Sequence, residues 1–310
     1  MIRTVLAWLL VVPFAVWATL RVTGVDLADR WIQLVAFTPY VAAASVVPLL
    51  AAGLLRRWAP LAVAVVTAGA LALAVLPRYF TDADPATGDR TFKVLAANLA
   101  VGAGDTAELV KLVERLQPDV LAIQELTPDA MKKLDALGLR ERMPYRVDRS
   151  HTGVWGSGIY SLHPLTEKPL LALGNFRQAR AAVKVKGGPE IEVVSVHPCA
   201  PSSTAKMACW RSGLAALPRA GGQLKVLAGD FNATLDHWPV RDLLRSGYRD
   251  AADVTGQGFT ATWPQQGWRP VPGVTIDHVL ADARMGVRSF SVHPLSSTDH
   301  RPVFAELTLP

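Results

Sequence analysis

The first 80 residues are almost free of charge, and this limits what they can fold into more than any other feature of the chain. They contain six arginines and two aspartates, and residues 4–20, 31–55 and 59–76 carry no charged side chain. Crossing the hydrocarbon core of a bilayer takes about 20 mainly apolar residues, within a range of roughly 17–25. Residues 1–78 are therefore predicted to form three transmembrane helices, which Pro13, Pro48 and Pro60 would kink or begin.

Two other interpretations of these stretches stay open. They could be buried core helices of a soluble protein. Residues 4–20 could also be a cleaved signal peptide, because Arg3 precedes an apolar core that small residues follow. In that second case two spans remain, and the rest of the chain still follows them.

The side of the membrane on which the rest of the chain lies is indicated by arginines and cysteines. If the N-terminus is cytoplasmic, the inner side holds slightly more positive charge than the outer side. The two cysteines, Cys199 and Cys209, lie in one loop and could form a disulfide in an oxidising compartment, contributing about 3 kcal/mol. The alternative is two reduced thiols without a role. We expect an extracytoplasmic domain on a multi-pass membrane protein.

The charge balance argues against nucleic acid as a partner. The net charge is +6, of which the six arginines and two aspartates of residues 1–80 supply 6 − 2 = +4, so residues 81–310 carry only +2. Binding to a nucleic-acid backbone needs lysines and arginines at the phosphates. The surplus instead lies beside the predicted spans.

Beyond the spans, the pattern predicts a turn-rich linker at residues 79–90 and a globular domain at 91–310. Asp105 caps a helix, since Glu108 and apolar residues at helical spacing follow it. Further helices are predicted at residues 209–217 and 238–245, and strands at 92–99, 120–126, 154–161, 181–185, 191–197, 224–228, 275–281, 287–293 and 303–309. Many strands with few helices predict two packed sheets with helices outside, an α+β layered sandwich.

Polar side chains recur where these apolar runs begin or end. The phrases are VLAANL, AIQEL, VSVHP, LAGDFNA, TIDHVL and SSTDHRP, which present Asn98, Glu125, His197, Asp230, Asn232, Asp277, Asp299 and His300. Together they offer carboxylates and imidazoles for a divalent metal, a water-activating group and phosphate donors. The set therefore predicts metal-assisted phosphoester hydrolysis.

The residue types suit different parts of that chemistry. A glutamate such as Glu125 is the hard oxygen ligand that Mg²⁺ prefers, and Asn98 at the end of the preceding strand could share or buttress that metal. Asp230 could accept a proton from water, and Asn232 could hold a phosphate oxygen without adding charge. Asp277 lies in an apolar run, where an unpaired carboxylate is costly, so a histidine is its natural partner.

Each signal also has a structural interpretation. Asp-x-Asn after a strand is often an Asx turn, Asp-His near a C-terminus is often surface structure, and Glu125 could form a salt bridge at a sheet rim. His278 is expected to be structural, like the four remaining histidines His151, His163, His237 and His293. Arg180 could contact a phosphate, although a solvated arginine is the simpler interpretation.

In their order along the chain, these motifs resemble the endonuclease/exonuclease/phosphatase superfamily. The resemblance rests on Asn98, Gln124-Glu125, His197, the GDFN motif at 229–232, Asp277-His278 and Ser-x-Asp299-His300, and it spans about residues 91–310. With three preceding spans, the chain looks most like the membrane-anchored teicoplanin-resistance (VanJ-type) branch.

The resemblance implies a fold and a set of roles. The fold is a four-layered α/β sandwich of two mixed sheets with the site at one edge. Glu125 would hold Mg²⁺ or Mn²⁺, with Asn98 and Asp299 adjoining. Asp230 would position or deprotonate the attacking water, which Asn232 would orient together with the phosphate. Asp277 would pair with His300, which donates to a phosphoryl oxygen, and His197 would be a second donor.

From this we expect a membrane-anchored phosphoesterase that acts on a lipid-linked phosphate or pyrophosphate, or on a phospholipid. A role in resistance to antibiotics that target the cell envelope is implied only by the resemblance. One alternative is a nuclease acting outside the cell. Another is a tethered scaffold that has lost turnover, which the completeness of the polar set argues against.

Overall fold

The computed structural model describes residues 1–25, 29–82, 88–173, 176–265 and 273–310. Its centre is a pair of six-stranded mixed sheets. The first has the order β13–β14–β1–β2–β4–β3, formed by Gly286–Val292, Val303–Thr308, Thr91–Asn98, Val120–Gln124, Ser157–Ser161 and Tyr145–Arg149. The second has the order β11–β12–β10–β9–β8–β5, formed by Tyr248–Asp250, Asp277–Asp282, Leu224–Asp230, Glu190–Val196, Arg180–Lys184 and Leu165–Glu167. A separate hairpin joins β6, Leu171–Leu173, to β7, Phe176–Gln178.

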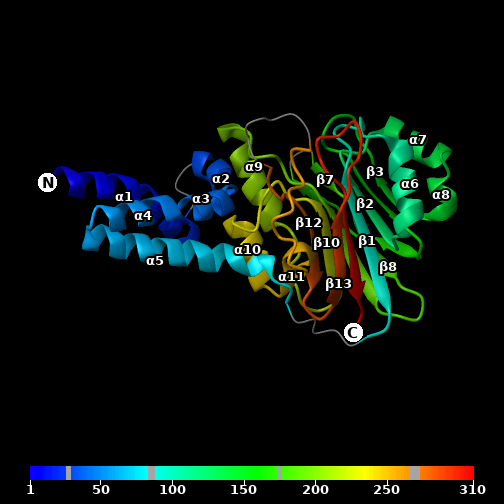
Figure 1. Ribbon diagram of the computed structural model, residues 1–310. Helices are drawn as coiled ribbons and strands as arrows, with labels where there is room; N and C mark the ends of the chain where they lie inside the picture. The colour runs from blue at the N-terminus through cyan, green and yellow to red at the C-terminus, as the bar shows by residue number, and fades with distance from the viewer. Residues whose placement is uncertain (26–28, 83–87, 174–175, 266–272) are drawn as a thin grey trace.

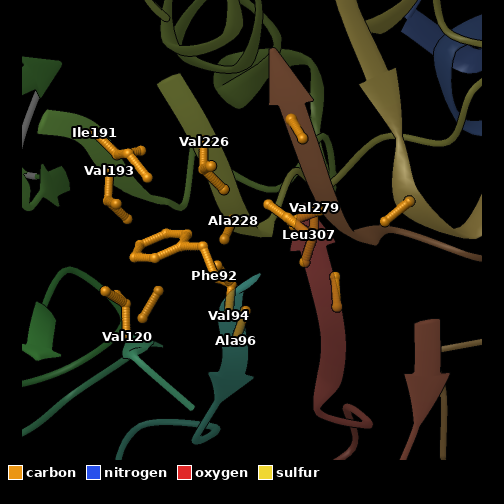
Figure 2. Packing of buried hydrophobic residues seen from close by; sticks show 14 of the residues in the cluster. Phe92, Val94, Ala96, Val120, Ile191, Val193, Val226, Ala228, Val279 and Leu307 are labelled. Atoms are coloured by element: carbon orange, nitrogen blue, oxygen red, sulfur yellow. The ribbon is translucent and has the colours of Figure 1, made fainter. Parts of the chain in front are cut away.

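The two sheets pack face to face through alternating side chains. In β1, Phe92, Val94 and Ala96 belong to the core between the sheets, whereas Leu95 and Ala97 belong to the core under the outer helices. This follows from the period of two along a strand, which sends neighbouring side chains to opposite faces. Figure 2 shows Phe92 and Val94 opposite Val193 and Val226 of the second sheet.

Helices cover the outer faces and complete four layers. On the first sheet lie α6, Thr106–Leu116, α7, Pro128–Ala136, and α8, Leu139–Arg142. On the second lie α9, Thr204–Ala215, and α10, Trp238–Arg245, while the short α11, Ala251–Val254, closes one side of the inner core. As predicted, Asp105 caps α6, where its carboxylate accepts from the N–H groups of Ala107 and Glu108. The expected layered sandwich of two mixed sheets flanked by helices is therefore confirmed.

The N-terminal helices form a region most of which projects away from this sandwich (Figure 1). They are α1, Ile2–Thr23, α2, Asp29–Val35, α3, Thr38–Ala44, α4, Val46–Leu54, and α5, Trp58–Val75, followed by the 3₁₀ turn η1, Leu76–Tyr79. Within the described residues, two helices are long and apolar enough to cross a membrane, Ile2–Thr23 and Trp58–Tyr79. A third span requires α2 and the α3–α4 segment to count as one bent element.

The predicted span over residues 31–55 is not one straight helix. The chain bends by 69° between Asp29–Val35 and Thr38–Leu54. Pro39 lies in the first turn of α3, where its missing N–H needs no helical partner. On the other side of the bend, Ile32 of α2 is fully buried in the core of the second sheet's helical layer. Packing against the sandwich therefore directs α2 away from the axis of α3.

Polar contacts fix the helices to the sandwich. Arg21 at the end of α1 and Arg78 in η1 both bind the carboxylate of Asp236. The imidazole of His237 bonds the carbonyl of Ile32 through Nε2, at 2.8 Å. Further bonds run from Gln33 to the carbonyl of Pro201 and from Tyr40 to that of Gly273, at 2.8 and 2.6 Å. Each helical segment up to α3 thus has its own attachment point on the sandwich.

Candidate active site at one edge of the sandwich

Topology gathers the predicted site residues at one edge of the two sheets. β1 and β2 are parallel, as are β9 and β10, so their carboxyl ends lie at the same edge. β12 and β14 run antiparallel to these strands, which places their starts there too. The strand ends and starts deliver seven predicted residues, Asn98, Glu125, His197, Asp230, Asp277, Asp299 and His300, and Asn232 follows in the loop after β10.

Glu125 turns away from the strand that precedes it. Its φ is 52°, a left-handed conformation that is uncommon for a residue with a side chain and that clusters at functional sites. Its Oε2 accepts from the N–H of Val101 at 2.7 Å, and its Oε1 lies 3.4 Å from Nδ2 of Asn98. The carboxylate is thereby held at the rim of the edge.

Asn98 links two carboxylates. Its Nδ2 also donates to Oδ2 of Asp230 at 3.0 Å, and its Oδ1 accepts from the N–H of Ala100. The side chain is almost completely buried. In this arrangement Asn98 fixes the spacing between Glu125 and Asp230.

The GDFN motif makes a tight turn that requires glycine. Gly229 has a φ of 143°, and a Cβ there would lie 2.4 Å from the carbonyl of Val196. Oδ1 of Asp230 accepts from the N–H of Asn232, and Nδ2 of Asn232 donates to the carbonyl of Pro198 at 3.2 Å. The Asx turn therefore forms, and the same turn presents both side chains at the edge.

Asp277 and His300 form a buried pair. Nδ1 of His300 donates to both carboxylate oxygens of Asp277, at 3.0 and 3.1 Å. The opposite nitrogen, Nε2, lies 3.7 Å from Oδ2 of Asp230. Asp277 thus fixes the orientation of the ring and aims Nε2 at Asp230.

His197 and Asp299 complete the edge. Nε2 of His197 lies 3.6 Å from both Oε1 of Glu125 and Oδ2 of Asp230. The side chain of Asp299 is half exposed, and its Oδ2 accepts from the indole N–H of Trp263 at 2.8 Å. The structure therefore brings all eight predicted residues into one cluster.

Burial and charge set the protonation of this cluster. Burial raises the pKa of Glu125 and of Asp230, and the charge of His300 opposes both shifts. Burial lowers the pKa of His197, which favours its neutral form. Burial also disfavours charge on His300, but Asp277 and Asp230 outweigh it and raise the pKa of His300 to about 10. His300 is therefore an imidazolium at neutral pH.

The donor set fits a divalent cation. Carboxyl groups of Glu125, Asp230, Asp277 and Asp299 gather at this edge, and burial disfavours charge on Glu125 and Asp230, so a bound cation would stabilise their ionised forms. Atoms of Asp230, Asp277 and His300 also lie within 4.8 Å of one another, a spacing that could hold a metal. Nδ1 of His300 is already bonded to Asp277, however, and Glu125 and Asp299 offer further oxygen donors at the same edge.

A cavity of about 1050 Å³, which we call the edge cavity, opens over these groups. Glu125, His197, Asp230, Asn232, Asp299 and His300 line it. So do residues that sequence reasoning missed: Ile32, Gln33, Ala36 and Phe37 from the N-terminal helices, the aromatic residues Trp155, Phe176 and Trp263, and the basic residue Lys206. Only the fold brings these residues here, since no motif in the sequence marks them.

The cysteines also lie at the edge cavity. Cys199 and Cys209 form a disulfide and both line the cavity wall. The disulfide ties the loop after His197 to α9. This helix begins at Thr204 and not at residue 209 as the sequence suggested. The loop that carries the Pro198 carbonyl, the acceptor for Asn232, is thereby anchored.

Several other residues lie outside the cluster. Arg180 pairs with Glu192 and does not line the edge cavity, so the solvated interpretation is replaced by an ion pair. His278 is fully buried between Asp250 and the carbonyl of Ala233, as a structural histidine would be. Of the other histidines, His163 pairs with Asp119, whereas His237 lines the edge cavity and contacts α2.

Several solved structures have a similar fold. An endonuclease/exonuclease/phosphatase from Beutenbergia cavernae matches with a TM-score of 0.57 and 18% identity over 71% of this chain and 72% of that chain. A D. rerio TDP2 complexed with single strand DNA product gives 0.56 and 17%, over 71% and 100% of the two chains. An AP endonuclease from Archaeoglobus fulgidus gives 0.52 and 14%, over 69% and 98%. These likenesses support the fold alone.

No curated protein matches the chain in sequence. The sequence model of the endonuclease/exonuclease/phosphatase family, however, matches residues 95–300, which include all eight site residues. Members of that family are typically metal-dependent phosphoesterases or nucleases. By this match, which covers most of the chain, the protein belongs to the endonuclease/exonuclease/phosphatase family.

Proposed function

We propose that this protein is a metal-dependent phosphoesterase that acts on a lipid phosphate ester at the surface of the membrane its N-terminal helices cross. One observation carries the proposal: two kinds of wall enclose the edge cavity. Its polar side consists of the phosphoesterase residues around Asp230 and His300, and another side consists of Ile32, Ala36 and Phe37. A cavity with a polar end and an apolar wall suits an amphiphilic substrate.

A divalent cation held by Glu125, with Asn98 and Asp299 adjoining, would supply a Lewis acid that stabilises charge on the phosphoryl oxygens. Oδ2 of Asp230 accepts a proton from the attacking water, and Asn232 orients that water. Nε2 of His300 donates a hydrogen bond to a non-bridging oxygen, while Asp277 holds the opposite ring nitrogen. Such donors are worth most where negative charge develops in the transition state.

The charge of the sandwich favours a lipid over a nucleic acid. Residues 81–310 carry a net charge of only +2, and Lys206 is the one lysine or arginine among the described residues that line the edge cavity. The substrate class is a lipid-linked phosphate or pyrophosphate, or a phospholipid. The resemblance to the teicoplanin-resistance branch supports a role in the cell envelope.

The test is a substrate panel with the full chain in detergent micelles. We expect Mg²⁺-dependent hydrolysis of an alkyl phosphomonoester or phosphodiester, which EDTA stops and Asp230→Asn abolishes. Asp119→Asn is the matched control, because that carboxylate also lies beside a histidine but outside the edge cavity. Faster cleavage of single-stranded or duplex DNA would make the protein a nuclease. No cleavage of any substrate would make it a scaffold.

We further propose that the sandwich lies outside the cytoplasm. The Cys199–Cys209 disulfide supports this side, because cytosolic thiols are kept reduced. Alkaline phosphatase fused after Pro310 should be active in the host cell. Protein isolated without reductant should also resist thiol alkylation until it is reduced. An inactive fusion together with freely alkylated cysteines would place the sandwich inside.

A further inference from the structure

A second cavity, of about 640 Å³, lies between α3, α5 and the sandwich, and we call it the helix groove. Its α5 side consists of Ala68, Ala72 and Val75, which recur at the spacing of one helix face, and Leu76 of η1 continues it. Pro39, Tyr40, Ala42 and Ala43 form its α3 side. Its size lies within the range of small-molecule pockets, roughly 300–1,000 Å³.

The helix groove adjoins the edge cavity. Ala36, at the bend between α2 and α3, lines both cavities, and so does Val274 of the sandwich. Ala36 has only a methyl side chain, so little bulk separates the phosphoesterase end from the helix groove at this point. The two cavities therefore meet at Ala36 and Val274.

The helix groove extends into the apolar part of a candidate span. Ala68 lies about 10 Å along α5 from Val75, at the rise of an α-helix, and both belong to the span Trp58–Tyr79. The charged side chains among the lining residues are Arg78 and Asp236, and these two bind each other. The groove therefore offers hydrocarbon surface without a free charge.

We propose that the helix groove binds the hydrocarbon chain of the lipid phosphate whose phosphoryl group lies in the edge cavity. The chain passes Ala36 and Val274 and continues between α3 and α5. The N-terminal helices are then part of the substrate site as well as an anchor. This inference rests on the proposed function, because it assigns the chain of that same substrate.

The test compares two chromogenic esters that differ only in the alkyl chain, para-nitrophenyl hexadecyl phosphate and para-nitrophenyl methyl phosphate. Ala72→Phe and Ala42→Phe each place a ring in the helix groove. We expect kcat/KM for the hexadecyl ester to fall by about tenfold or more, mainly through KM, because burial of the chain is lost. We expect the methyl ester to be hydrolysed at a rate within about twofold of the wild type, since it does not reach the helix groove.

Ala70→Phe is the matched control. It introduces the same ring on α5 outside the helix groove, on the side of Val66 and Leu73, which are 72% and 80% exposed. Ala70→Phe should hydrolyse both esters like the wild type. If Ala72→Phe behaves like Ala70→Phe on the hexadecyl ester, the helix groove does not hold the chain, although the proposed function stands. If the wild type hydrolyses both esters equally well, the lipid substrate itself is wrong.

A binding measurement on the wild-type protein tests the same inference if the variants fail to fold. Hexadecyl phosphate with a diazirine at the end of its chain is photolysed with the wild-type protein in micelles. Label on α3 and α5 peptides that excess hexadecyl phosphate displaces, but hexadecanol does not, supports the inference. If hexadecanol displaces the label from these peptides as well as hexadecyl phosphate does, or if neither compound displaces it, the inference is overturned.

Discussion

Arg78 binds Asp236 through two parallel hydrogen bonds, Nη1 to Oδ2 at 2.8 Å and Nη2 to Oδ1 at 2.7 Å. The two residues join η1, at the end of the last N-terminal helix, to the loop after β10 that carries Asn232. Arg21 of α1 donates to the same carboxylate at 2.9 Å. Two helix ends therefore converge on one aspartate only four residues after Asn232.

Asp236→Asn should destabilise the protein strongly. Burial raises the pKa of Asp236, but Arg78 and Arg21 outweigh it and hold that pKa below its usual range, so the carboxylate is ionised. Removing one member of a buried ion pair leaves uncompensated charge and costs about 3–5 kcal/mol. Unfolding of the variant in detergent, followed by circular dichroism, measures this loss.

Asp242→Asn is the matched control, since its partner Arg219 is more than half exposed. Exposed pairs contribute about 0–1 kcal/mol, so this variant should unfold close to the wild type. Equal effects of the two substitutions would mean that the Asp236 cluster does not stabilise the junction.

His237 should make stability depend on pH. Its Nδ1 accepts from the N–H of Thr234, and its Nε2 contacts the carbonyl of Ile32, which requires a neutral ring. Burial lowers the pKa of His237 from 6.5 to about 4. Because the unfolded chain then binds the proton more readily, stability is complete above pH 6.5 and falls as the pH drops toward 4. The loss reaches about 3 kcal/mol.

His237→Gln removes this titration, so the free energy of unfolding should fall less steeply between pH 6.5 and 4 than in the wild type. Asp253 titrates in the same range with the opposite sign, because burial first and Asp250 second raise its pKa to about 6. Asp253 is present in both proteins, so the difference between their slopes isolates His237. Parallel slopes would contradict the assignment.

His300→Ala and Asp277→Asn should lower kcat by different amounts. Loss of a donor to a developing oxyanion costs about 10²–10³-fold, which we expect for His300→Ala. Asp277→Asn keeps the shape of the pair but removes the negative charge that orients His300 and favours its protonated form. We therefore expect a smaller loss of kcat, about tenfold or more. Steady-state kinetics on the most active ester of the panel gives both values. His163→Asn, in a carboxylate–imidazole pair outside the edge cavity, should leave kcat unchanged.

The sequence anticipated the sandwich and its polar edge, because both depend on local patterns. Strands with a period of two and caps such as Asp105 are determined within a few residues. The eight polar residues lie at strand ends, and parallel neighbours then bring them together. The resemblance to a family supplied their roles.

The remaining features depend on contacts between distant segments. The bend before Thr38 accompanies the burial of Ile32 of α2 in the core of the second sheet's helical layer, which the hydropathy of residues 31–55 does not show. Strands such as Leu165–Glu167 and Phe176–Gln178 are three residues long and lack a periodic signal. The cavity walls could not be predicted for the same reason, since Phe37 and Trp263 meet only in the fold.

Trp263→Phe should weaken metal binding without removing a ligand. The indole N–H donates to Oδ2 of Asp299 at 2.8 Å, and this bond fixes the rotamer of a side chain that is otherwise half exposed. Phenylalanine keeps an aromatic ring at the rim but cannot donate. Loss of a hydrogen bond to a metal ligand typically costs about 10–100-fold in affinity or activity, so the Mg²⁺ concentration for half-maximal activity should rise by about tenfold or more. Activity at saturating Mg²⁺ should return close to that of the wild type.

Trp155→Phe, which alters another aromatic residue of the same cavity, should leave the Mg²⁺ dependence unchanged. An unchanged Mg²⁺ dependence in Trp263→Phe would instead show that Asp299 does not hold the metal.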